Sequence, residues 1–218
     1  MDLARRPLAR LVVFAQAFAA AALTGCASLP ADGIARGEVL YQNCMQCHGE
    51  AGEGSDLVKA PQIAGLPTWY ITGQVSHFQH GIRGAHADDV AGLKMRPMSR
   101  TLKSDADVAV VAEYVASLPH AKKSATVQGD AAKGQSAFAT CAACHGADGA
   151  GNEALKSPPI RQLEDWYIVV QLDKFKSGVR GYDASDAQGQ QMAGIAKGLA
   201  DKSAMNDLAA YIQTLPAH

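Results

Sequence analysis

Residues 44–48 read Cys-Met-Gln-Cys-His, and residues 141–145 read Cys-Ala-Ala-Cys-His, so one five-residue pattern occurs twice in the chain. In each copy two thiols lie about one helical turn apart, and a histidine directly follows the second thiol. Apolar residues at helical spacing precede both copies, in residues 33–43 and 130–140, and predict a helix that leads into each pattern. The chain is therefore organised around two similar thiol–imidazole clusters.

The two patterns belong to a longer internal repeat with an offset of 97 residues. Residues 69–71, Trp-Tyr-Ile, return as residues 166–168, and the Arg-Gly pair at 83–84 returns at 180–181, all without a gap. This match predicts two like domains joined by a short polar linker. Their expected bounds are 33–119 for the first domain, 120–128 for the linker and 129–217 for the second domain.

Each copy has the pattern of a helical domain. Further helices are expected at residues 68–80 and 105–118 in the first copy, with Thr68 as an N-cap, and at 165–176 and 205–215 in the second. Loops with glycine and proline separate these segments, and none of them shows the alternating apolar pattern of a strand. The expected fold class is all-α.

The paired thiols followed by histidine favour covalent haem attachment. Each thiol adds to one vinyl group of a haem, and the histidine is then placed to ligate the iron from one side. Zinc sites commonly gather four ligands locally, whereas these pairs lie in separate repeats. A dithiol redox motif belongs in a βαβ context, and structural disulfides leave both histidines unexplained. Two covalently bound haem c groups are expected, on Cys44, Cys47, His48, Cys141, Cys144 and His145.

Each copy resembles a class I cytochrome c domain: a helix with a glycine before an aromatic residue, the Cys-x-x-Cys-His pentad, a proline, a distal methionine and a last helix with a tyrosine. The whole of residues 33–216 resembles the two-domain, two-haem cytochrome c4 type. The resemblance implies two tandem class I cytochrome c domains with their haems facing each other across the domain interface. It also implies electron transfer as the activity.

The repeat selects a methionine for the second side of each iron. Met95 returns as Met192, each 47 residues after the histidine of its pentad, whereas Met98 returns as Ile195. A thioether ligand raises the reduction potential of a haem, so Met95 and Met192 are the expected sixth ligands, although a single methionine can equally serve core packing. Three further histidines have no histidine counterpart in the second copy and are expected at the surface: His77, His80 and His86.

Other repeated residues have supporting roles. Pro61 and Pro158 each lie 13 residues after a pentad histidine, and the resemblance implies that their carbonyls accept the histidine Nδ1 hydrogen. The spacing is one residue longer than in the pattern compared, which leaves this role open. The Trp-Tyr pairs suit either haem propionates or the core. Gly37 and Gly134 are expected where the first and last helices of each copy cross.

The N-terminal region has the pattern of an export signal. Three arginines within residues 1–10 precede an apolar run from 11 to 23, too short to span a membrane. The run ends in Leu-Thr-Gly before Cys26, which resembles the lipobox of bacterial lipoproteins. We expect a signal peptide at residues 1–25, lipidation of Cys26 and a periplasmic protein anchored to a membrane by lipid. Signal cleavage nearby without lipidation is the alternative.

The formal net charge is −1, which offers no basic excess for nucleic acid. Aromatic residues make up only 6%, and apolar haem faces would supply the missing core bulk.

We expect a carrier of single electrons rather than an enzyme. The expected donor is a quinol-oxidising complex or a cytochrome, and the expected acceptor is a terminal oxidase. The alternatives are a haem subunit of a larger dehydrogenase or oxidase complex, and a di-haem enzyme with one open iron site.

Overall fold

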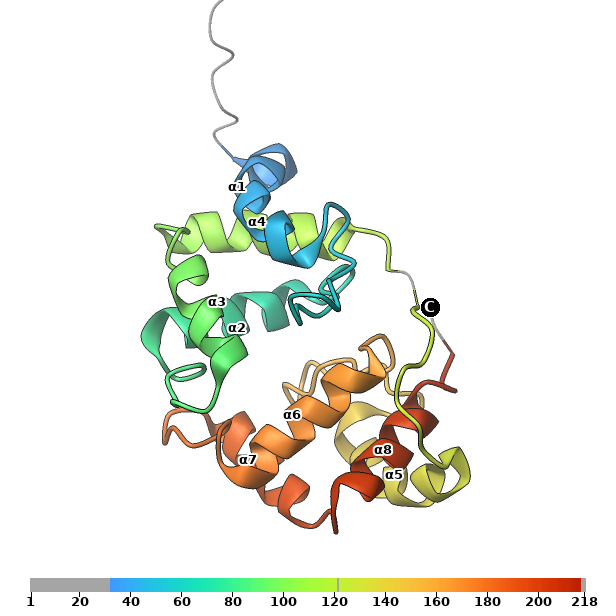
Figure 1. The fold of residues 1–218 in the computed structure, drawn as a ribbon. Helices are drawn as coiled ribbons and strands as arrows, with labels where there is room; N and C mark the ends of the chain where they lie inside the picture. The colour runs from blue at the N-terminus through green and yellow to red at the C-terminus, as the bar shows by residue number, and fades with distance from the viewer. Residues whose placement is uncertain (1–31, 121, 217–218) are drawn as a thin grey trace, which may run out of the picture.

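The computed structural model describes residues 32–120 and 122–216, which form two groups of four α-helices (Figure 1). The first half contains α1 (Gly33–His48), α2 (Thr68–His80), α3 (Val90–Ser99) and α4 (Asp105–Ser117). The second half contains α5 (Ala131–His145), α6 (Asp165–Ser177), α7 (Ala187–Lys197) and α8 (Lys202–Ile212). The described residues contain only two isolated β-bridges and no strand, so the all-α expectation is confirmed.

The first and last helices of each half cross closely. A Cβ atom on Gly134 of α5 would lie 1.9 Å from the carbonyl oxygen of Asp207 in α8, and one on Gly37 of α1 would lie 2.2 Å from that of Val110 in α4. Only a glycine permits so close an approach. The aromatic rings beside each crossing pack against each other in a tilted arrangement, with centroid distances of 5.3 Å for Tyr41–Tyr114 and 5.2 Å for Phe138–Tyr211. The expected crossings at the two glycines are confirmed.

Helices α3 and α7 occupy segments that the sequence pattern assigned to loops. Pro97 lies inside α3, and Gly189 and Gly194 lie inside α7, so residues that weaken helices masked the apolar periodicity. Both helices begin with an aspartate side chain that caps the backbone: Asp89 accepts from Gly92 N and Asp186 from Gly189 N. These caps also lie in register at the repeat offset.

Several predicted helix boundaries were wrong. Helix α1 continues through the whole first pentad to His48, and α5 continues to His145, so both histidines end a helix. Helix α8 runs from Lys202 to Ile212 rather than from 205 to 215, because Asp201 caps it through Ala204 N. At α2 the capping position is taken by Pro67, and Thr68 is the first helical residue.

The segment between the halves is held against the second half. Asp165, at the start of α6, accepts hydrogen bonds from Thr126 N at 2.5 Å, Val127 N at 2.6 Å and Thr126 Oγ1 at 2.9 Å. Lys122 donates to the carbonyl of Leu215 at 2.8 Å. These contacts fix the point from which the second half extends.

No helix among residues 32–120 and 122–216 combines the length and hydropathy that crossing a bilayer requires. The expected signal peptide at residues 1–25 and the expected lipidation site Cys26 lie outside the described residues.

Candidate haem sites

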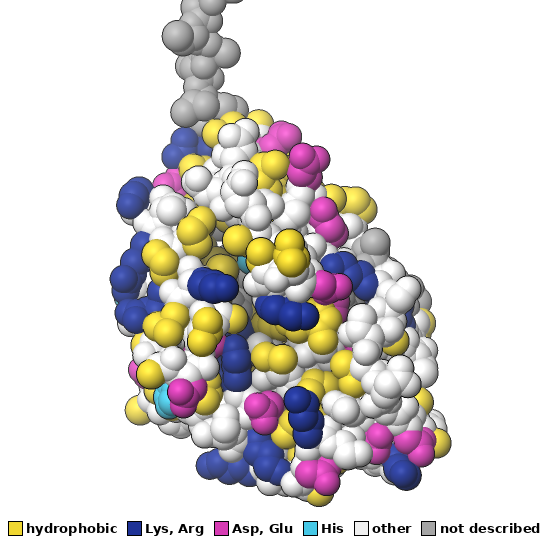
Figure 2. Space-filling view, in the orientation of Figure 1, with side chains coloured by type: hydrophobic (Ala, Val, Ile, Leu, Met, Phe, Trp, Pro, Cys, Tyr) yellow, Lys and Arg dark blue, Asp and Glu magenta, His cyan; other side chains and the backbone are white. Residues whose placement is uncertain are grey.

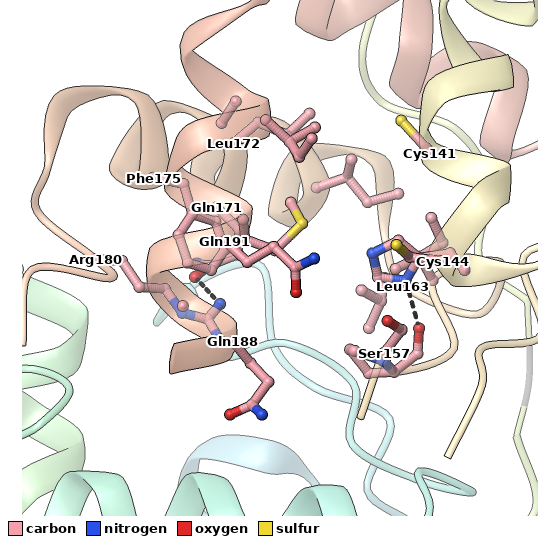
Figure 3. A pocket seen from close by; sticks show the side chains of 18 of the residues that line it. Cys141, Cys144, Ser157, Leu163, Gln171, Leu172, Phe175, Arg180, Gln188 and Gln191 are labelled. Carbon is pink, nitrogen blue, oxygen red and sulfur yellow. Dashed lines mark hydrogen bonds between the residues drawn. The ribbon is translucent and has the colours of Figure 1, made fainter. Parts of the chain in front are cut away.

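Each half contains a large, mostly apolar cavity beside its pentad. The second-half cavity has a volume of about 760 Å³ and is lined by Cys141, Cys144, His145 and Met192. Figure 3 shows its two cysteines on the α5 side, with Arg180, Gln188 and Gln191 from other segments across the space. Volumes of this size suit a cofactor, and the structure brings the four predicted residues of this half to one cavity.

The first-half cavity has a volume of about 520 Å³ and contains the corresponding residues Cys44, Cys47, His48 and Met95. Met98 lines it as well. Met98 is 37% exposed, whereas Met95 is half-buried. Judged by position in the cavity, either methionine could serve as the predicted ligand. The repeat register is what distinguishes Met95 from Met98.

In both pentad histidines the ring nitrogen Nδ1 is engaged in a hydrogen bond. His48 Nδ1 lies 2.8 Å from the carbonyl oxygen of Pro61, and His145 Nδ1 lies 2.8 Å from that of Pro158. A carbonyl only accepts, so Nδ1 donates and Nε2 keeps its lone pair. Burial lowers the pKa of both imidazoles, despite the proline carbonyls, which raise it. The structure thus holds two neutral imidazoles ready to bind a metal ion through Nε2, and the role implied for the prolines is present.

A glycine turn brings each proline carbonyl to its histidine. Gly54 and Gly151 have φ angles of 76° and 84°, and their N–H groups donate to the carbonyls of His48 and His145. A Cβ atom on Gly54 would lie 2.5 Å from Gln62 N. The left-handed backbone and the close approach explain why a glycine stands at this point of both repeats.

The four pentad cysteines are free thiols. Burial, followed by the charge of Cys47, raises the pKa of the Cys44 thiol to about 11, and burial also raises the pKa of Cys141. Each pair lies at the wall of its cavity without forming a disulfide. Thiols at that wall and an imidazole with a free Nε2 fit covalent haem, while groups of three or more ligating His, Cys, Asp or Glu residues are absent among residues 32–120 and 122–216.

The expectation that His77 is a surface residue was wrong. It lines the cavity of the opposite half, and its buried Nδ1 lies 4.0 Å from Asp186 Oδ2 without a hydrogen-bond partner. The sequence gives no signal for this position, because it depends on how the two halves face each other. His80 is exposed and His86 is partly exposed, as expected.

Each half contributes a helix to the other half's cavity. Trp69, Tyr70 and Gln74 of α2 line the second-half cavity, and Trp166, Tyr167 and Gln171 of α6 line the first-half cavity. The indole N–H of Trp166 is buried and has no hydrogen-bond partner. The tryptophans therefore lie at the opposite cavity rather than at their own.

Arg83 and Arg180 are functional candidates that the sequence analysis noted only as repeat matches. Both are buried, with 8% of each residue exposed, and they meet between the cavities. The sequence signal that could have identified them is an arginine at the same repeat position in both halves.

The family model for cytochrome c matches residues 34–119 and 131–216. The chain is 34% identical over 146 residues to the Cbb3-type cytochrome c oxidase subunit CcoP of Rubrivivax gelatinosus, covering 60% of this chain and 42% of that subunit. It is 30% identical over 155 residues to the thiosulfate dehydrogenase electron acceptor of Thiomonas intermedia, covering 65% of this chain and 66% of that protein. Among solved structures, reduced recombinant cytochrome c4 from Pseudomonas stutzeri matches with a TM-score of 0.66 and 25% identity, covering 85% of this chain and 100% of that one.

Proposed function

Because the chain belongs to the cytochrome c family, with a cytochrome c domain in each half, we propose that it relays single electrons between redox proteins through two covalent haem c groups. One observation carries the proposal. In each cavity a pair of thiols, a neutral imidazole with its Nδ1 hydrogen bonded and a methionine thioether converge on one space. That set of groups occurs twice, in register.

We assign the residues as follows. Cys44 and Cys47 form the thioether links in the first domain, and Cys141 and Cys144 form them in the second. The iron ligands are His48 with Met95, and His145 with Met192. When bound, each haem supplies an iron that gains or loses one electron.

The chain's own residues favour transfer over catalysis. The proline carbonyls fix the orientation of the imidazoles and strengthen them as donors. Apolar side chains such as Leu172 and Ile212 line the cavity walls and exclude water. Met95 and Met192 would complete the ligand set of each bound iron and would leave no position for oxygen or substrate.

We propose a terminal oxidase as the electron acceptor and a quinol-oxidising complex or another cytochrome as the donor. The similarity to an oxidase subunit supports the acceptor, although this chain spans only 42% of that subunit. Charges of both signs are spread over the face in Figure 2 among hydrophobic patches, and the net charge of −1 gives weak electrostatic steering.

A second candidate is a cytochrome that accepts electrons from a dehydrogenase of sulfur compounds, or forms its haem subunit. The relative from Thiomonas intermedia, named as the electron acceptor of a thiosulfate dehydrogenase, favours it. Reduction of the purified protein by a membrane fraction with quinol or with thiosulfate as the reductant separates the two donors. Fast reduction by thiosulfate alone, without any partner, would indicate an enzyme instead.

The test of electron transfer is an optical redox titration of the matured protein. Two one-electron steps are expected, with a pyridine haemochrome assay giving two haems for each chain. A single haem, or absorbance that does not change with applied potential, would contradict the proposal.

We propose a periplasmic location with a lipid anchor on Cys26, supported by the basic start and the Leu-Thr-Gly-Cys pattern. Several acyl chains hold a protein firmly, since each buried CH₂ contributes about 0.8 kcal/mol. Detergent phase partitioning should place the native protein in the detergent phase and Cys26→Ser in the aqueous phase. Aqueous partitioning of both would contradict the anchor.

A further inference from the structure

The peptide group between Pro61 and Gln62 is hydrogen bonded at both ends. Its carbonyl oxygen accepts from His48 Nδ1 at 2.8 Å. Its N–H belongs to Gln62 and donates to the carboxylate of Glu164, with the nitrogen 2.9 Å from Oε1 and 3.1 Å from Oε2. Glu164 belongs to the second domain and caps the start of α6. One peptide group therefore connects a carboxylate of the second domain to the predicted iron-binding histidine of the first.

The carboxylate of Glu164 is buried at the domain interface, with 6% of the residue exposed. It accepts from the N–H of Gln62 and pairs with the ammonium group of Lys123 in the linker, 3.3 Å from Oε1. A carboxylate in such a place is costly unless it is paired and hydrogen bonded, so the contact with Gln62 is part of what allows its burial. Glu164 lines neither of the two cavities. It therefore reaches a cofactor bound there through the peptide group and not by direct contact.

The second domain lacks both parts of this connection. At the repeat offset Gln62 corresponds to Pro159, which has no N–H to donate. Glu164 corresponds to Pro67, which has no carboxylate. The peptide group between Pro158 and Pro159 therefore cannot form the second hydrogen bond.

The geometry at the two histidines is otherwise the same. His48 Nδ1 and His145 Nδ1 each lie 2.8 Å from the proline carbonyl oxygen. The backbone at Glu164, with φ −63° and ψ 144°, matches that at Pro67, with φ −59° and ψ 140°. The second domain is thus an internal reference that has the same histidine–carbonyl bond without a carboxylate behind it.

Hydrogen bonds at the two ends of a peptide group strengthen each other, because each polarises the group in the same direction. A carboxylate acceptor makes the bond from Gln62 N charge-assisted, about twice as strong as a bond between neutral groups. The carbonyl oxygen of Pro61 then carries more negative charge and accepts more strongly from His48 Nδ1. An imidazole held in this way is a stronger donor to a metal through Nε2, and a stronger donor favours oxidised over reduced iron.

We propose that Glu164 is a positioning residue that lowers the reduction potential of the first-domain haem through the peptide group between Pro61 and Gln62, and that the second-domain haem has no such control. The inference rests on the proposed two-haem function. The effect on one haem separates the two potentials and favours an electron on the second-domain haem. Because the carboxylate and the peptide group belong to different domains, the effect requires the two domains to be docked.

The test is a redox titration of purified two-haem protein, with NMR assigning each potential to its haem. Glu164→Gln removes the charge at nearly constant size, and the potential of the first-domain haem should rise while the other stays unchanged. Gln62→Pro removes the N–H, leaves the carboxylate in place and introduces the residue found at this position of the second domain. It should also raise the first potential alone. Asp173→Asn, which removes an exposed carboxylate from α6, is the matched control and should move neither potential.

A second measurement follows the hydrogen bond itself in the fully reduced protein. The NMR signal of the His48 Nδ1 proton should move upfield in Glu164→Gln and in Gln62→Pro, because its bond to the carbonyl of Pro61 weakens. The corresponding proton of His145 should not move. A loss of stability without weakening of this bond would leave both signals in place.

The proposal is overturned if Glu164→Gln raises the first potential and Gln62→Pro does not, since the carboxylate would then act as a charge through space. It is also overturned if Glu164→Gln leaves both potentials unchanged or shifts both alike. If Gln62→Pro does not mature, the His48 Nδ1 proton in Glu164→Gln decides, and an unchanged signal overturns the proposal. In each of these outcomes the Glu164→Gln protein still titrates with two haems, so the carrier function stands.

Discussion

At the residue scale, two backbone carbonyls determine what the pentad histidines can do. Pro61 and Pro158 each engage an Nδ1 at 2.8 Å, and burial keeps the imidazoles neutral by lowering their pKa. The resemblance to class I cytochrome c domains pointed to these prolines, which both copies place 13 residues after the histidine, although that spacing left their role open. The glycine turn that directs each carbonyl to its histidine could not be predicted from the sequence. It depends on backbone φ angles that a glycine permits but does not require.

The methionine assignment is tested by the weak near-infrared band of oxidised haem with a sulfur ligand. Met95→Ala and Met192→Ala should each abolish the band at one of the two haems, because each removes one thioether. Met98→Ala, which alters another methionine of the first-domain cavity, should leave the band at full strength. Loss of the band in Met98→Ala and its retention in Met95→Ala would show that the register argument chose the wrong residue.

At the element scale, the helix crossings determine whether each domain can close. Their glycines could be identified from the repeat, since a glycine before an aromatic residue recurs in the first helix of both copies. Helices α3 and α7 could not be identified from the sequence, because Pro97, Gly189 and Gly194 weaken the helical pattern. Tertiary packing stabilises these helices despite the low helix propensity of those residues. The element that carries each proposed methionine ligand was therefore the one that the sequence placed in a loop.

Gly134→Ala should destabilise the second domain by about 3 kcal/mol, because the new Cβ overlaps the α8 backbone. Gly194→Ala in α7 is the control, since nothing lies within 4 Å of its added Cβ, and it should stabilise the domain by about 0.5–1 kcal/mol. Chemical denaturation followed by circular dichroism measures both. Equal stabilities for the two variants would mean that α5 and α8 do not cross as closely as described.

Asp165 should hold the linker to the start of α6. Burial alone would raise the pKa of its carboxyl, but the N–H groups of Val127 and Thr126 and the Thr126 hydroxyl lower it below the ordinary value. Asp165→Ala should cost about 1–2 kcal/mol and expose the linker to proteases, because the partly buried donors of Thr126 and Val127 lose their acceptor. Asp173→Ala, an exposed carboxylate on the same helix, should change neither property. Equal protease resistance in both variants would show that Asp165 does not hold the linker in place.

At the scale of the whole molecule, two pairs of side chains in repeat register lie across the domain interface, and one of them is an ion pair. Lys174 contacts Asp89 at 2.5 Å, and His77 faces Asp186 at 4.0 Å. At the repeat offset His77 corresponds to Lys174, and Asp89 corresponds to Asp186. The sequence alone could not show that these residues contact each other across the domains. Pairing requires the relative placement of the two domains, and the same reason hid the contacts of Arg83 and Arg180 across the interface and the partial burial of His77.

The Lys174–Asp89 pair should make the molecule sensitive to acid. Burial alone would raise the pKa of Asp89, but Lys174 and the N–H of Gly92 lower it below the ordinary value. A lowered carboxyl pKa stabilises the folded state above the unfolded value of about 3.9, and this stabilisation is lost as the pH falls through the folded value.

Thermal unfolding of the native protein and of Asp89→Asn measures this contribution. The variant should be less stable by about 3 kcal/mol near neutral pH, and the difference should shrink as the pH falls below about 4. A difference that stays constant down to pH values well below about 3 would mean that Asp89 does not ionise differently in the two states.

The carrier account depends most directly on both irons being saturated by the protein. Carbon monoxide binds to reduced haem only where a coordination position is open or easily vacated, so its difference spectrum on the fully reduced native protein measures this point. The account predicts no carbon monoxide complex at either haem in the native protein, and a complex at one haem in Met95→Ala or Met192→Ala. A complex at either haem of the native protein would contradict it, and would indicate a vacant iron suited to catalysis.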